Sequence, residues 1–174
     1  MSEWAVVTGA SGGLGEAFAR ELADQGSNVV LVARSGDKME QLASELSARH
    51  GVETLVVPCD LSDPDQRASL VSRLDGLDVH TLVNNAGFGS SGMLGGHPPD
   101  GCPRTGTSFF TNAGNGYAMS QRRTPGQVVS STFAALRSGK PYVVDGPGNK
   151  LAAQVTRFPP TRVLVQAASW VATR

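Results

Sequence analysis

The chain has 174 residues, of which 40% are hydrophobic and 17% are charged, a balance typical of one globular domain with a buried core. Its 15 basic and 15 acidic side chains give a net charge of zero. This balance argues against a surface that binds nucleic acid or an anionic membrane.

The first predicted elements are a buried strand and a helix joined by a glycine-rich turn. Residues 4–7 form a short apolar run, and residues 16–25 have the pattern of a helix. In such a turn Gly9 takes the tight bend, Gly13 lets the backbone approach a pyrophosphate, and Gly15 lets the helix pack closely on the strand. The amides of the helix N-terminus face the phosphate charge. The predicted contacts are Gly9, Ser11, Gly12, Gly13, Leu14 and Gly15. An ordinary glycine-rich loop is the alternative, since the chain has 21 glycines.

The second predicted strand, Asn28–Ala33, ends at Arg34 and Ser35. In this architecture the end of the second strand faces the adenosine ribose. An acidic residue there would bind a free 2'-hydroxyl, whereas an arginine pairs with a 2'-phosphate. Arg34 therefore favours NADP over NAD, and its alternative role is that of a solvated loop residue.

The chain then continues the alternation of helix and strand. An amphipathic helix is predicted over Asp37–His50, a strand over Glu53–Val57, a helix opened by Asp63 and Pro64, and a strand over Val79–Val83. Asp60 follows the third strand, where it serves either a site or a local turn. The fourth strand is followed by Asn84-Asn85-Ala86-Gly87.

These motifs together resemble the short-chain dehydrogenase/reductase family. Thr8-Gly9-x-x-x-Gly13-x-Gly15, then Asp60, then Asn84-Asn85-Ala86-Gly87 follow the order and spacing of that family over residues 1–92. The resemblance implies an α/β fold, a Rossmann-like doubly wound parallel sheet with strand order 3-2-1-4. It also implies NADP(H) as the cofactor, with Asp60 near the adenine. The cofactor-binding residues implied after the glycine loop are Arg34, Asp60, Leu61, Asn84, Ala86 and Gly87.

The catalytic pattern of the family, Tyr-x-x-x-Lys, is missing from the sequence. Tyr117 is followed four residues later by Gln121, and Tyr142 by Gly146. A tyrosine with a pKa of about 10 is a poor proton donor at neutral pH unless a nearby ammonium lowers that pKa. Catalytic residues are therefore unknown.

The second half of the chain predicts a shortened fold. Residues 93–123 are an irregular linker without periodic apolar segments. A helix is predicted over Thr124–Ser138, and a strand over Lys140–Val144 is expected to lie beside the fourth strand. Two more helices are predicted over Asn149–Phe158 and Thr161–Ala172. We therefore expect a single dinucleotide-binding domain over 1–174, with a cofactor half (1–92), a linker (93–123) and a C-terminal part (124–174). Its truncated sheet gains one C-terminal strand and is followed by C-terminal helices.

Three hypotheses for function remain open. By resemblance, the chain is an NADP(H)-dependent oxidoreductase that acts on a small carbonyl or alcohol substrate. Alternatively, it is a catalytically silent NADP(H)-binding pseudoenzyme or a shortened product that serves as a binding or regulatory module. A rebuilt site that uses Tyr117, Lys140 or Tyr142 is the third hypothesis.

The expected setting is the cytoplasm, without a membrane or nucleic-acid partner. We find no signal-peptide pattern and no apolar run of membrane-spanning length. The two cysteines, Cys59 and Cys102, suit free thiols in a reducing compartment. The three histidines are too scattered to predict a metal site, and the sequence does not predict an oligomeric state.

Overall fold

The computed structural model describes residues 3–87, 123–146, 150 and 153–154. Residues 3–87 belong to one compact unit, and the described residues from 123 onward belong to a second. Of the predicted linker only Arg123 is described. The predicted helix Thr161–Ala172 and most of Asn149–Phe158 lie outside the described residues. Among the helices of the described ranges, none combines the length and the apolar composition of a membrane span.

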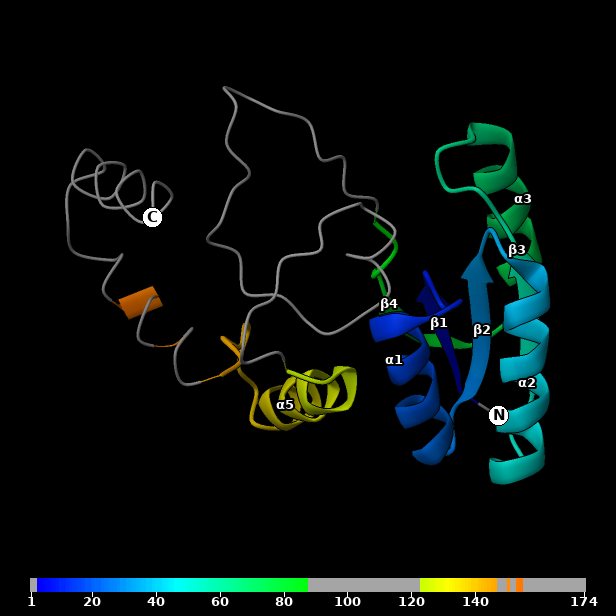
Figure 1. Ribbon diagram of the computed structural model, residues 1–174. Coiled ribbons are helices and arrows are strands. Elements are labelled where there is room, and N and C mark those ends of the chain that lie inside the picture. The colour runs from blue at the N-terminus through cyan, green and yellow to red at the C-terminus, as the bar shows by residue number, and fades with distance from the viewer. Residues whose placement is uncertain (1–2, 88–122, 147–149, 151–152, 155–174) are drawn as a thin grey trace, which may run out of the picture. The chain divides into compact units, whose positions relative to one another are not determined.

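The first unit is a parallel sheet of four strands in the order β3-β2-β1-β4, as predicted (Figure 1). The strands are β1 (Trp4–Thr8), β2 (Asn28–Ala33), β3 (Thr54–Pro58) and β4 (Val79–Val83). The connecting helices are α1 (Gly13–Asp24), α2 (Gly36–His50) and α3 (Pro64–Leu74). The largest shift from the predicted bounds is at α1, which begins inside the glycine motif rather than after it.

The core lies on both faces of β1 and β2. All six residues of β2 are buried, as expected for a strand covered on both faces. On one face Val6, Val30 and Val32 form a cluster with Leu70 of α3. The intervening residues of the strands point to the opposite face, where α1 packs against β1 and β2, and α2 packs against β2 and β3.

The sheet ends at β4 with apolar side chains exposed. Leu82 is 65% exposed and Val79 is 39% exposed. The predicted strand over Lys140–Val144 is wrong, because these residues have no strand structure. Pro141 lacks the N–H that a strand interior needs, and Gly139 turns the chain with a φ of +67°.

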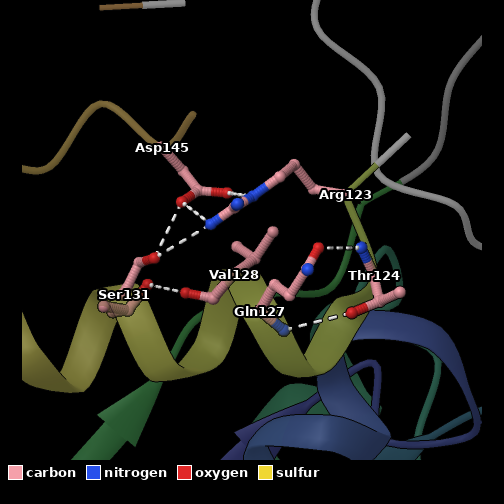
Figure 2. A network of polar contacts seen from close by, with 7 residues as sticks. Arg123, Thr124, Gln127, Val128, Ser131 and Asp145 are labelled. Atoms are coloured by element: carbon pink, nitrogen blue, oxygen red, sulfur yellow. Dashed lines mark hydrogen bonds and ion pairs between the residues drawn. The ribbon is translucent and has the colours of Figure 1, made fainter. Parts of the chain in front are cut away.

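The second unit contains helix α5 (Pro125–Arg137), whose start was predicted from its cap residues. The Gln127 amide donates to Thr124 Oγ1 (3.3 Å), and the Thr124 amide donates to Gln127 Oε1 (3.0 Å) (Figure 2). This reciprocal pair is a capping box, and Pro125 occupies the first helical position. The helix therefore begins where the local sequence dictates.

An ion pair ties the segment after α5 back to the beginning of that helix (Figure 2). Arg123 donates through Nε to Asp145 Oδ2 and through Nη2 to Asp145 Oδ1, both at 2.8 Å. Ser131 Oγ also donates to Asp145 Oδ1, at 2.7 Å. Two hydrogen bonds in a fork fix both groups more firmly than a single contact. We name this set the Arg123–Asp145 clasp.

The clasp predicts a sensitivity to acid. The Arg123 guanidinium holds the pKa of Asp145 below its usual value, against the opposing effect of burial. Because folding lowers this pKa, the ionised Asp145 stabilises the folded state fully at pH values above the ordinary aspartate pKa of about 4. This stabilisation is lost as the pH falls through the lowered pKa.

We expect Asp145→Asn to accelerate amide hydrogen exchange across residues 138–146 at neutral pH, as measured by mass spectrometry. Ser130→Ala, at an exposed position on the same helix, is the control. Equal exchange in both variants would contradict a role for the clasp.

Candidate dinucleotide-binding site

The predicted site residues all follow the carboxyl ends of the strands. The glycine motif follows β1, Arg34 follows β2, Asp60 and Leu61 follow β3, and residues 84–87 follow β4. The carboxyl ends of parallel strands lie at one edge of the sheet, which is where ligands bind in open α/β sheets. The structure therefore brings these residues to one edge.

Thr8 joins the ends of β1 and β4 through its hydroxyl group. Thr8 Oγ1 donates to the Val83 carbonyl (3.2 Å) and accepts from the amides of Asn85 and Ala86 (2.9 Å each). Asn85 Nδ2 donates in return to the Thr8 carbonyl (3.0 Å). We call this set of four bonds the Thr8 joint. The sequence analysis did not include Thr8 or Asn85 among the site residues. The available signal was a hydroxyl residue directly before the first glycine of the motif.

The glycines of the loop are required by the space around them. Gly9 has a φ of +69° and Gly13 a φ of +63°, a region of backbone conformation that favours glycine. A Cβ on Gly15 would lie 2.2 Å from the Gly9 carbonyl oxygen and 2.8 Å from Asn85 Nδ2. Any side chain at position 15 would therefore push α1 away from the loop.

The N-terminus of α1 is left open for an anion. Its N-cap is Gly12, and within residues 3–87 no side chain caps the amides of the first turn. Uncapped amides and the helix dipole together favour a phosphate group at this position. The backbone cradle therefore fits the diphosphate of a dinucleotide.

The acidic residue in the first turn of α1 is paired rather than free. Glu16 Oε1 accepts from Arg20 Nη2 at 2.8 Å. Arg20 also donates to Glu45 on α2, and this contact is the main cause of the raised pKa of Arg20. Because Arg20 balances its charge, Glu16 opposes an incoming phosphate less than an isolated carboxylate would.

The end of β2 offers a cation and a hydroxyl. Arg34 is exposed, and it makes no hydrogen bond to any described residue. The neighbouring Ser35 is the N-cap of α2, yet its side chain does not cap the helix. Asp60 is close enough for the charge of Arg34 to lower its pKa, although the hydrogen bonds from Ser62 contribute more to that shift. A planar guanidinium beside an unused hydroxyl can bind a phosphate group.

The Thr8 joint is open to a direct test. Thr8→Val keeps the shape of the side chain but removes three hydrogen bonds of the hydroxyl. The Ala86 amide loses its bond to Thr8 Oγ1, whereas the Asn85 amide and the Val83 carbonyl keep the bond to each other at 3.0 Å. With three hydrogen bonds lost at a buried position, we expect the free energy of unfolding to fall by about 2 to 3 kcal/mol in a urea titration. Thr8→Ser keeps the hydroxyl and is expected to retain most of the stability. If both variants were equally stable, the hydroxyl would not hold the two strand ends together.

Comparison with known proteins finds relatives that cover about half of this chain. The very-long-chain 3-oxoacyl-CoA reductase of Bos taurus is 42% identical over 88 residues, which are 51% of this chain and 28% of the relative. The protein of the same name from Scheffersomyces stipitis is 49% identical over 87 residues, which are 49% of this chain and 25% of the relative. The chain thus spans less than a third of the length of these curated relatives.

Solved structures similar to this chain include an alcohol dehydrogenase and a short-chain dehydrogenase. An alcohol dehydrogenase from Thermococcus sibiricus, complexed with 5-hydroxy-NADP, is 38% identical with a TM-score of 0.52, over 54% of this chain and 41% of its own. A short-chain dehydrogenase from Sphingobium yanoikuyae in complex with NADPH covers 90% of this chain and 94% of its own with a TM-score of 0.71. At 18% identity, the second comparison shows the fold alone.

The family model described as short chain dehydrogenase matches residues 3–100, which are more than half of the 174 residues. The match contains the whole parallel sheet and each of the strand ends at which the candidate site is built. The chain belongs to the short-chain dehydrogenase family.

Proposed function

We propose that the chain binds NADP(H) at the carboxyl edge of its sheet. The observation that carries the proposal is the uncapped N-terminus of α1 beside a glycine loop that the Thr8 joint fixes to β4. The related structure from Thermococcus sibiricus, which contains 5-hydroxy-NADP, supports the choice of cofactor.

Each part of the cofactor has residues to hold it in this proposal. The first-turn amides of α1 bind the diphosphate. Arg34 and the Ser35 hydroxyl bind the 2'-phosphate, which NADP(H) has and NAD(H) lacks. The adenosine side is formed by Asp60, Leu61, Asn84, Ala86 and Gly87. When bound, the nicotinamide supplies a hydride to a carbonyl carbon or accepts one from an alcohol.

The proposed reaction is the reduction of a carbonyl group or the reverse oxidation of an alcohol. Family membership and the names of the curated relatives, very-long-chain 3-oxoacyl-CoA reductases, support this reaction class. A 3-oxoacyl thioester is therefore the first substrate class to test.

A second candidate function is silent binding of NADP(H) by a regulatory or shortened protein. It is favoured by one observation in the sequence, the absence of Tyr-x-x-x-Lys. Gln121 follows Tyr117 and Gly146 follows Tyr142 at the lysine position. Neither replacement has the positive charge that lowers the pKa of a tyrosine.

Calorimetric titration tests the binding of the cofactor. We expect NADPH to bind at least about tenfold more tightly than NADH, because a charge-assisted hydrogen bond to the 2'-phosphate contributes more than a neutral one. Arg34→Ala is expected to remove this preference and to leave NADH binding nearly unchanged. Arg49→Ala, in the last turn of α2, is the matched control for charge. Equal affinities for both cofactors in the unaltered chain would overturn the assignment of Arg34.

An assay of turnover separates the two candidate functions. The chain is incubated with NADPH and either a 3-oxoacyl thioester or a panel of simple ketones, while NADPH absorbance and the hydroxy product are followed. Carbonyl reduction predicts that NADPH is consumed with one hydroxy product formed per hydride. Saturable NADPH binding without consumption on any carbonyl supports the silent binder instead. If turnover is found, Tyr117→Phe tests whether this tyrosine donates the proton.

A further inference from the structure

A groove lies between helix α3 and β3, the strand at the outer edge of the sheet. Its volume is about 280 Å³. The residues that line it are Val57, Pro58, Gln66, Ser69, Leu70 and Arg73. None of them belongs to the candidate dinucleotide-binding site, so the proposed function leaves this concave surface without a role. We call it the β3–α3 groove.

One side of α3 forms a wall of the groove. Its four lining residues, 66, 69, 70 and 73, follow the spacing i, i+3, i+4 and i+7, which places them in a row along one side of a helix. At a rise of about 1.5 Å per residue, the row is roughly 10 Å long. The helix therefore lines the groove with a carboxamide, a hydroxyl, an aliphatic group and a guanidinium, in that order.

The deepest part of the groove is apolar and preformed. Val57 is 4% exposed and Leu70 is 8% exposed, and both belong to the core cluster that also contains residues of β1 and β2. Because side chains of a close-packed core have little room to move, these two residues keep their positions whether or not a ligand is bound. The ring of Pro58 adds apolar surface at the end of β3.

The groove also carries a positive charge without a counter-charge. Arg73 is exposed and makes no hydrogen bond or ion pair with any described residue. The other arginine of α3 is used by the fold, since Arg67 Nη1 donates to the Leu61 carbonyl (2.9 Å). None of the lining residues is acidic. The charge of Arg73 is therefore available to an anionic group of a ligand.

The two ends of the row differ in their free polar groups. At one end Gln66 Oε1 accepts from the Asp60 amide (2.8 Å) and Gln66 Nε2 donates to Asp63 Oδ2 (2.9 Å), so its carboxamide is held by the turn before α3. At the other end the exposed Ser69 hydroxyl lies one helical turn from Arg73. An anionic group is therefore favoured at the C-terminal end of α3.

We propose that the β3–α3 groove binds a small aliphatic carboxylate. The carboxylate pairs with the Arg73 guanidinium and accepts a hydrogen bond from the Ser69 hydroxyl, while the aliphatic chain covers Val57, Pro58 and Leu70. A guanidinium matches a carboxylate with two parallel hydrogen bonds, and covering the apolar surface removes it from water. A volume of about 280 Å³ is at the lower end for small-molecule sites, which favours a short chain.

An NMR titration of the full chain with octanoate tests the proposal. We expect the amide signals of Val57 and of residues 69–73 to shift and to saturate. Butanoate is expected to bind at least about tenfold more weakly, because its shorter chain covers less apolar surface. Octylamine has the chain of octanoate with the opposite charge, and we expect it to leave these signals in place. Equal shifts with octylamine, or no saturable shift with octanoate, would overturn the proposal.

A variant of the arginine separates the charge from the shape of the groove. Arg73→Gln is expected to weaken octanoate binding about tenfold, the effect of losing a charge-assisted hydrogen bond, and to leave the weaker binding of 1-octanol nearly unchanged. A variant that merely distorted the groove would weaken both ligands. Arg49→Gln, at an exposed position in the last turn of α2, is the matched control and keeps the affinity for octanoate.

The positions of the shifted signals distinguish this groove from the cofactor site. If octanoate shifts the signals of residues 34–35 and 60–61 instead of residues 69–73, it binds at the strand ends and the proposal is wrong. The proposal does not depend on the cofactor, so NADPH that failed to bind would leave the octanoate result as it is.

Discussion

The candidate site depends on one side-chain hydroxyl, that of Thr8. Thr8 is only 6% exposed, and its hydroxyl accepts hydrogen bonds from two amides of the segment after β4 while it donates one to the carbonyl of the last residue of that strand. The glycine loop begins at the next residue, so its starting point is fixed by β4 as well as by β1. The same contact explains the shortage of space around the loop, because it holds Asn85 Nδ2 close to the glycines. A Cβ added to Gly9 or to Gly15 would lie 2.8 Å from this nitrogen. The glycines are needed because the joint is tight.

The sequence predicted those parts of the fold that local chemistry determines. The caps of α3 and α5 were found from Asp63-Pro64 and Thr124-Pro125, since a capping side chain acts within three residues of itself. The strand order followed from the motifs and the family they resemble. The Thr8 joint was missed because its partners lie 75 to 78 positions away along the chain, and a hydroxyl residue before the first glycine does not by itself identify those partners.

The failed strand prediction has a similar cause. Residues 142–144, Tyr-Val-Val, have the composition of a strand, and composition was the basis of the prediction. In the structure these residues lie between Pro141, which has no backbone N–H to donate, and Asp145, which is held by the Arg123–Asp145 clasp. Arg123 and Asp145 are 22 residues apart, and neither residue alone indicates that they pair. Among the elements that fall within the described residues, this strand is the one predicted wrongly, and a pairing between residues 22 positions apart lies directly beside it.

The electrostatics of the site show why a net charge of zero says little about an anion-binding loop. Glu16 lies in the first turn of α1, where a free carboxylate would compete with a phosphate for the same amides. Arg20 pairs with it and also with Glu45, so this trio carries one net negative charge that is spread over two helices. At the other end of the edge Arg34 is exposed while Asp60 is restrained by its own turn. The residues proposed to hold a dinucleotide all lie within residues 8–87, whereas the spacing Tyr-x-x-x-Lys occurs nowhere in the sequence.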